Sequence, residues 1–220
     1  MKTRYYGAFV LPLLFGASTA LAFDAVLETV PTQYEVITIQ NPETEQLILG
    51  ELQDAPEMFE IVSENPFTLS IEIRGVPDKS LDSLPMLNGI IIKQKEVRGV
   101  EEIARLNATD SNWEIVTDKT TGLNYHAGTY FNEEVEAGTY RIEISSPNNQ
   151  GRYMLLVGTN TDDNGYLASL SDIKSVYQFY GLGTMRMFSS PYVHYPLGII
   201  VLIGLIGGTW YWQRNQKQYA

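Results

Sequence analysis

The sequence predicts an all-β fold, an antiparallel, jelly-roll-like β-sandwich, followed by a linker helix and one transmembrane helix. Three observations predict it: short runs of alternating apolar and polar residues up to Gly158, helical spacing of apolar residues after it, and an uncharged apolar segment near the C-terminus. The 220 residues are 44% hydrophobic and 19% charged, enough apolar material for one core. The expected segments are a signal peptide (1–22), an exported sandwich (23–158), a linker with a short amphipathic helix (159–191), a transmembrane helix (192–212) and a cytoplasmic tail (213–220).

The N-terminus has the features of a secretory signal peptide. Lys2 and Arg4 precede an apolar stretch over 8–21, which ends in the small-x-small pattern Ala20-Leu21-Ala22. This stretch is shorter than the roughly 20 residues that a spanning helix needs. We therefore expect cleavage after Ala22, with a retained membrane anchor as the alternative.

Eight segments of the exported part are predicted to be strands. The most regular is 67–73, in which Phe67, Leu69, Ile71 and Ile73 share one face and polar residues share the other. Such alternation is typical of an antiparallel sheet with one face in the core. Turn residues at 41–43 and 147–151 separate the runs. The predicted strands are 34–39, 46–52, 58–62, 67–73, 90–95, 113–116, 139–144 and 152–157.

A helix of about three turns is expected after the polar loop 159–165. Ser169, with Asp172 three residues later, suggests a capping box at its start, and Gly181 and Gly183 suggest its end. We expect the helix to lie on the domain or on the membrane interface, with its apolar side used for core packing rather than for binding a partner. That side contains Leu170, Ile173, Tyr177 and Tyr180.

The segment 197–209 is apolar and carries no charge. Residues 192–212 are long enough to cross about 30 Å of hydrocarbon at about 1.5 Å per residue. Arg214 and Lys217 follow, which predicts a cytoplasmic C-terminus and places the remainder outside the cytoplasm. With the compact signal and the absence of cysteine, the predicted location is the bacterial inner (plasma) membrane, crossed once. The aromatic residues expected at the two membrane interfaces are Tyr192, Tyr195, Trp210, Tyr211 and Trp212.

Gly204 and Gly208 lie four residues apart within this predicted span. Two helices that lack side chains at these positions approach closely, so the pair suggests self-association or pairing with another membrane protein. The alternative is that glycine is simply common in spanning helices.

Composition excludes several classes of function. The chain has 26 Asp and Glu against 15 Lys and Arg, a net charge of −11, so nucleic-acid binding is not expected. The chain has no Cys, which excludes disulfides, thiolate metal sites and a cysteine nucleophile. Residues 23–190 keep all 26 acidic residues but only 11 basic ones, a net charge of −15. This surface is suited to solubility, and the alternative is that it faces a cationic partner or divalent ions.

No constellation of residues predicts catalysis. Carboxylates are plentiful, as at Glu133 and Glu134, but no motif sets a pair across a cleft, and no GxSxG is present. His126 is the one histidine away from the predicted span and the only candidate base. We therefore expect no enzymatic activity, no catalytic residue and no cofactor, with calcium left open.

Two weak sequence patterns suggest metal binding. Asn160, Asp162 and Asn164 resemble the first half of a calcium loop, but the acid expected at position twelve is missing, which favours an ordinary polar turn. Met185, Met187 and His194 offer soft ligands for copper, and the alternative is that the methionines only pack.

Two parts of the chain carry a resemblance to a known family. The first is Gly50-Glu51-Leu52 with the strands at 58–61 and 67–71, and the second is Ala137-Gly138-Thr139-Tyr140 with the strand at 151–157. Together they resemble the bacterial pre-peptidase C-terminal (PPC) domain, a small sandwich appended to secreted enzymes. The chain also looks like a group of bacterial membrane-anchored proteins with such a sandwich, a linker helix and a terminal span. The resemblance implies a binding or accessory module, sometimes calcium-dependent, and supplies no catalytic residues.

These features together predict a single-pass, membrane-anchored, extracytoplasmic binding or scaffold protein, an accessory subunit of a cell-envelope complex. The expected partners are the membrane and a membrane protein or second copy paired through the transmembrane helix. The alternative is a metal-responsive exported binding protein that uses calcium or copper.

Overall fold

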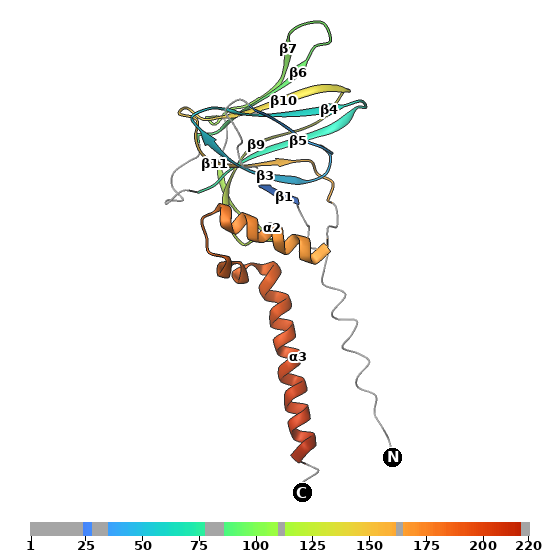
Figure 1. Cartoon of the computed structure of the whole chain (residues 1–220), viewed down its shortest axis with the longest axis vertical. Coiled ribbons are helices and arrows are strands. Elements are labelled where there is room, and N and C mark those ends of the chain that lie inside the picture. The colour runs from blue at the N-terminus through green and yellow to red at the C-terminus, as the bar shows by residue number, and fades with distance from the viewer. Residues whose placement is uncertain (1–23, 28–34, 78–85, 110–112, 162–164, 217–220) are drawn as a thin grey trace.

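The computed structural model describes residues 24–27, 35–77, 86–109, 113–161 and 165–216. Within these residues, strands form two facing sheets and the helices follow them (Figure 1). The predicted signal peptide lies outside the described residues and stays a prediction. The prediction of a β-sandwich with C-terminal helices is confirmed.

One sheet has six strands in the order β1-β3-β11-β5-β9-β8, and the other has five in the order β2-β4-β10-β6-β7. The six are β1 Asp24–Leu27, β3 Gln46–Gln53, β5 Phe67–Gly75, β8 Glu114–Thr117, β9 Asn124–Val135 and β11 Gln150–Val157. The five are β2 Val36–Thr38, β4 Glu57–Ser63, β6 Asn88–Gln94, β7 Val100–Leu106 and β10 Gly138–Ser145. The helices are α2 Gly165–Phe179, the short 3₁₀ helix η1 Thr184–Ser189 and α3 Pro191–Gln216.

The core between the sheets is built by the alternation seen in the sequence. In β5 the apolar face of Phe67, Leu69, Ile71 and Ile73 is buried, while the polar residues between them are half-buried. Alternate residues of a strand point to opposite faces, so one strand supplies both core and surface. Phe59, Ile91, Ile142 and Leu155 from other strands join the same core.

The sheets are not purely antiparallel, which corrects the predicted topology. β1 pairs with β3 in parallel, and β2 pairs with β4 in parallel. The chain changes sheet at each step from β1 to β4, so strands two apart in sequence become neighbours and run in the same direction. The other strand pairs are antiparallel, as predicted.

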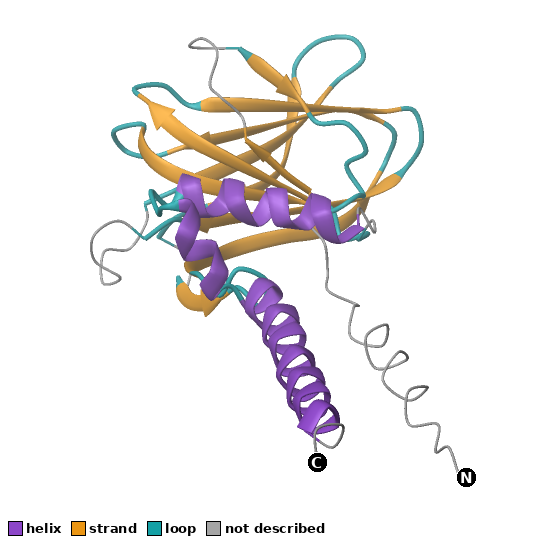
Figure 2. Ribbon diagram, turned by 60° about the horizontal axis from the view of Figure 1, so that its bottom comes forward, coloured by secondary structure: helices purple, strands orange, loops and turns teal. Residues whose placement is uncertain are grey.

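A second, smaller core lies between the six-stranded sheet and α2, which lies below β1 and β3 in Figure 1 and crosses in front of the strands in Figure 2. Leu47, Leu49 and Met154 contribute from the sheet and Val176 from the helix. Ile173 and Tyr177 of α2 are also buried. The predicted packing of this helix on the domain is therefore confirmed.

Candidate functional site

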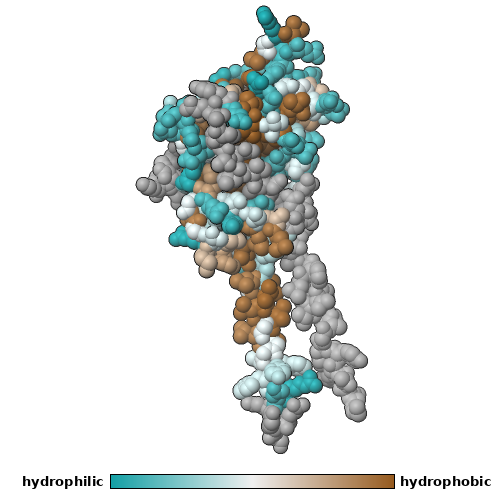
Figure 3. All heavy atoms as spheres, in the orientation of Figure 1, coloured by the Kyte–Doolittle hydropathy of each residue, from teal (hydrophilic) through white to brown (hydrophobic). Residues whose placement is uncertain are grey.

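The apolar helix α3 is the feature that most restricts where the protein works. Residues Pro191–Trp212 are long and apolar enough to cross a membrane, and almost none of this segment is buried within the described structure. A core helix of a soluble protein is instead covered by its neighbours. Its exposed aliphatic side chains include Leu197, Ile199, Ile200, Val201, Leu202, Leu205 and Ile206, and Figure 3 shows the apolar surface along the helix.

The start of α3 is attached to the sandwich through the turn between β8 and β9. The buried Ser190 hydroxyl donates a hydrogen bond to the Thr120 carbonyl at 2.5 Å. The ring of Pro191 packs on Gly122, where a Cβ would lie 3.0 Å from the Pro191 Cδ. Gly122 also has φ +73°, a backbone conformation that disfavours a side chain. The apolar helix therefore leaves the sandwich from a packed contact.

Asp118 shapes this turn. Its Oδ1 accepts hydrogen bonds from the backbone N–H of Thr120 at 3.1 Å and of Thr121 at 2.6 Å, and from the Thr121 hydroxyl at 2.8 Å. An Asp that bonds the backbone two and three residues ahead is a common turn device. The turn carbonyls that result are the acceptors for the helical segment.

Helix α2 closes the junction from the other side. The Tyr177 hydroxyl donates to the Thr121 carbonyl at 2.8 Å, and the ring of Tyr166 stacks on that of Tyr192 in the first turn of α3, with centroids 5.1 Å apart. A β-strand turn, α2 and the first turn of α3 thus meet at one place.

The predicted capping box at Ser169 and Asp172 is wrong, because α2 begins at Gly165 and both residues lie inside the helix. The predicted end is confirmed, and its geometry is specific. Gly181 has φ +71°, the Leu182 N–H bonds the Tyr177 carbonyl and the Gly181 N–H bonds the Gln178 carbonyl. These two bonds form a Schellman motif, in which glycine adopts the left-handed conformation.

A polar cluster lies beneath the C-terminal end of α2. Arg74 bonds Glu72 at 2.7 Å and lies over the Tyr125 ring, 4.5 Å from its centroid. Burial lowers the pKa of Arg74, but the hydrogen bond and charge of Glu72 outweigh it and raise that pKa. The Tyr180 hydroxyl donates to the Asn124 carbonyl at 3.0 Å, and burial raises its pKa. Arg74 therefore stays charged, and the Tyr180 hydroxyl stays a neutral donor that ties the residue just after α2 to the start of β9.

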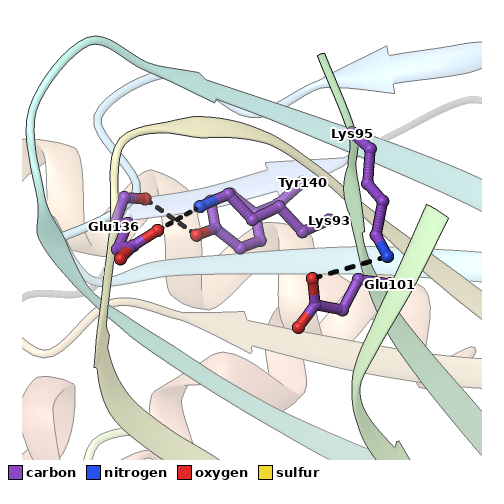
Figure 4. Close-up of polar contacts among 5 residues, drawn as sticks. All are labelled: Lys93, Lys95, Glu101, Glu136 and Tyr140. Carbon is purple, nitrogen blue, oxygen red and sulfur yellow. Dashed lines mark hydrogen bonds and ion pairs between the residues drawn. The ribbon is translucent and has the colours of Figure 1, made fainter. Parts of the chain in front are cut away.

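A second polar cluster lies on the five-stranded sheet (Figure 4). The Lys93 ammonium bonds Glu136 at 2.9 Å and lies 5.6 Å from the centroid of the Tyr140 ring. The hydrogen bond that Lys93 donates to Glu136 raises the pKa of Lys93 and lowers the pKa of Glu136. Lys95, just after β6, pairs more loosely with Glu101 of β7, at 4.0 Å. Within each pair the two charges neutralise each other. The pair of Lys93 and Glu136 therefore leaves no unpaired charge for a ligand.

Comparisons with known proteins add one likeness of structure. No protein-family model matches the sequence, and the search of curated proteins finds no match. A solved structure, the pre-peptidase C-terminal domain of a collagenase from Bacillus anthracis, is similar to the chain. It has 12% sequence identity and a TM-score of 0.36, and the match covers 58% of this chain and 97% of that domain. A likeness at this level carries no argument about ligands or activity, and nothing in the comparisons points to the membrane-anchored group.

The predicted calcium ligands are only partly described. Asn160 lies in an exposed segment whose backbone bonds Glu43 and Glu45, whereas Asp162 and Asn164 lie outside the described residues. Among the residues that the structure describes, no group of three or more His, Asp or Glu side chains is arranged to hold a metal ion. The calcium site stays an untested prediction.

The predicted copper ligands lie on neighbouring elements. Met185 and Met187 belong to η1, and the exposed His194 lies in the first turn of α3. The His194 Nδ1 is 3.2 Å from the Ser189 carbonyl, which leaves Nε2 as the ring nitrogen open to a metal. Within the described part of the chain, no hydrogen bond or ring contact joins these three side chains, so this site too stays a prediction.

His126, the only candidate base, lies in β9 and is 1% exposed. Neither of its ring nitrogens has a hydrogen-bond partner among the described residues. A base must reach the proton that it removes, and this imidazole is enclosed by the fold.

Three residues of the junction were not predicted from the sequence: Thr120, Tyr166 and Ser190. The segment 118–122, with an Asp, two Thr and a Gly, carried a turn signal that could have located the Asp118 turn. Its contact with Pro191 joins residues about seventy positions apart and has no local signal. Gly204 and Gly208 lie where predicted, in the exposed part of α3, with no described atom near the position of an added Cβ.

Proposed function

We propose that this chain is a single-pass protein of the bacterial inner membrane whose β-sandwich lies outside the cytoplasm and serves as a binding or scaffold subunit of a cell-envelope complex. The observation that carries the proposal is the exposed apolar surface of α3, which no described element covers. Exposure of an apolar helix of this length to water is unfavourable, whereas the hydrocarbon of a bilayer stabilises it. Arg214 after the span favours a cytoplasmic C-terminus.

The rest of the geometry supports a scaffold better than an enzyme. The one candidate base is enclosed, and the clusters at Arg74 and Lys93 are internally neutralised ion pairs. The start of α3 is joined to the sandwich by the hydrogen bond of Ser190, and α2 is joined to the same turn by the hydrogen bond of Tyr177. Such a joint transmits the position of the span to the sandwich, which is what a subunit that presents a surface in a complex requires.

The orientation is tested with single-cysteine variants of the full chain, since the natural sequence has no Cys. Val97→Cys, in the highly exposed β6–β7 hairpin, should react with an impermeant maleimide in spheroplasts. Gln218→Cys, after the span, should react only after the membrane is opened. The reverse pattern, or reaction of both sites at once, would contradict the proposed topology.

The accessory role is tested by purification of the full chain in mild detergent, with identification of the proteins that co-elute. A stoichiometric membrane partner that is lost with Gly204→Leu plus Gly208→Leu would support pairing through the span. Gly198→Leu is the matched control, because it lies in the same helix about 120° away from Gly204 at roughly 100° per residue. Recovery of the wild-type chain alone would contradict the accessory role.

A further inference from the structure

The surface around the start of α3 is apolar and exposed. We define the collar as Tyr166 and Leu167 of α2, Met185 and Phe188 of η1, and Tyr195 of α3. Leu167 is 81% exposed and Met185 is 79% exposed. Scattered exposed apolar residues are normal on a protein, but these gather around one helix end and therefore require an explanation.

The collar is continuous with the apolar surface of α3. The ring of Tyr166 stacks on Tyr192, the first aromatic residue of the candidate span, and η1 contacts both helices. Figure 3 shows apolar surface that runs from the lower edge of the sandwich onto α3. Because Tyr192 and Tyr195 are expected at the membrane interface, the remainder of the collar lies at about the same depth.

Charge differs sharply between the part of the chain that forms the sandwich and the helical part that follows it. Residues 23–164 contain 25 Asp and Glu and nine Lys and Arg, a net charge of −16. Residues 165–196 contain Asp172, Lys174 and Arg186, a net charge of +1. Anionic headgroups repel a strongly acidic surface and tolerate a neutral or slightly basic one.

The rest of α2 has the polarity that the headgroup region would favour. Its exposed residues after Leu167 are Ser171, Lys174 and Gln178, while Ile173, Val176 and Tyr177 are buried against the sandwich. A Lys at this level reaches lipid phosphates, and aromatic or aliphatic side chains beside it enter the boundary of the acyl chains.

We propose that the collar docks the sandwich onto the lipid interface of the bilayer that α3 crosses, and so holds the sandwich in one orientation above the membrane. This inference rests on the proposed function, because it requires α3 to span a bilayer. The occupant of the surface is lipid, and the alternatives are a second copy of the chain or another protein.

The test uses the full chain in vesicles of phosphatidylethanolamine and phosphatidylglycerol at a high lipid-to-protein ratio, with no other protein present. Single cysteines replace Leu167, Met185, Leu205 or Val97 and carry a polarity-sensitive fluorophore. All four native side chains are exposed, so the substitutions leave the core intact. Val97, 93% exposed at the distal hairpin, is the matched control, and Leu205 reports insertion of α3.

Nitroxide lipids labelled near the headgroup should quench the fluorophore at Leu167→Cys and Met185→Cys several-fold more than at Val97→Cys. Nitroxide labelled deep in the acyl chain should quench Leu205→Cys. Quenching at Leu205→Cys alone, with the collar positions no different from Val97→Cys, would overturn the collar and leave the membrane anchor standing. Absence of quenching at Leu205→Cys would overturn the anchor itself.

A further arm separates lipid from protein as the occupant. Iodide in the aqueous phase should reach Val97→Cys and be excluded from the collar positions. Exclusion of iodide without quenching by lipid would mean that another chain covers the collar, which overturns the lipid assignment. Exclusion of iodide that weakens as the protein is diluted into more lipid would likewise identify a second copy as the occupant.

Discussion

The hydroxyl of Tyr140 donates a hydrogen bond to the backbone carbonyl of Glu136, four residues earlier, at 2.7 Å (Figure 4). The bond closes the turn between β9 and β10, and Gly138 between them has φ +151°. β-Sandwiches use such a tyrosine to hold a corner between strands. The geometry of this corner therefore explains the sequence Ala137-Gly138-Thr139-Tyr140 without reference to any family.

Tyr140→Phe should lower the free energy of unfolding by about 1 kcal/mol, since it removes one buried hydrogen bond and keeps the ring. Urea unfolding of the full chain in mild detergent measures the change. Tyr130→Phe is the control, because Tyr130 is mostly exposed and its substitution should change little. Equal effects of the two variants would show that the corner does not contribute.

Gly50 is required by the ring of Tyr153. These residues are opposite each other in β3 and β11, and a Cβ on Gly50 would lie 2.4 Å from the Tyr153 ring. Gly50→Ala should therefore cost about 1–3 kcal/mol of stability through overpacking. Gly183→Ala, where no atom lies within 4 Å, is the control and should be nearly neutral.

The steric origin of this effect is tested by a double-mutant cycle with Tyr153→Leu, in which the ring is removed. Gly50→Ala should cost markedly less in the Tyr153→Leu background than in the wild type. An unchanged cost would place the strain elsewhere, for instance in the backbone of β3.

Glu45 gives the chain a defined pH dependence. Burial raises the pKa of Glu45, although the charge of Arg74 partly opposes the shift. A raised pKa means that the folded state disfavours the carboxylate, so stability is lost as pH rises from the ordinary value near 4.5 through the folded pKa. Glu45→Gln should therefore raise the melting temperature at neutral pH and have little effect below that ordinary value. Glu96→Gln, on the exposed hairpin, should show no such difference, and a Glu45→Gln benefit that is constant with pH would contradict the assignment.

Substitutions at the junction between the β8–β9 turn, α2 and α3 should destabilise this region without destabilising the whole sandwich. Tyr177→Phe and Ser190→Ala each remove a donor to a carbonyl of the β8–β9 turn and should cost about 1–2 kcal/mol locally. Amide hydrogen exchange should rise in α2 and in residues 118–122, with less change in β5 and β10. Ser175→Ala is the control, because the Ser175 hydroxyl bonds the Ser171 carbonyl within α2 rather than the β8–β9 turn. Unchanged exchange in both regions would show that the helices are held by apolar packing alone.

The strands that the sequence predicts correctly share strict alternation, as in β5 and β10. Two long strands were not predicted, β7 and β9. β7 lies at the edge of its sheet and begins with exposed residues, so it has little apolar pattern. β9 changes face where the register with β5 shifts between Glu72 and Arg74, and a shift of one residue interrupts the period of two.

In the candidate site too, the features with a local sequence signal were predicted and those that depend on distant contacts were not. The apolar helix α3 and the glycine stop of α2 were predicted, because hydropathy and the left-handed conformation of Gly181 are local properties. The capping box was misplaced, since Ser169 fits the motif equally well in isolation, whereas α2 begins about one turn earlier, at Gly165. The junction at Thr120, Thr121 and Ser190 was not predicted.

The sequence by itself determined that the chain has a sandwich of alternating strands, a helix that packs on it and an apolar helix near the C-terminus. These follow from the periodicity and hydropathy of neighbouring residues, which act over a few positions. Only the tertiary structure decided which strands are neighbours, that two edge pairs are parallel, and that the Asp118 turn meets the start of α3. Those choices depend on contacts between residues far apart in the chain, where side-chain packing and hydrogen bonds across elements select one arrangement among many that satisfy the same local pattern.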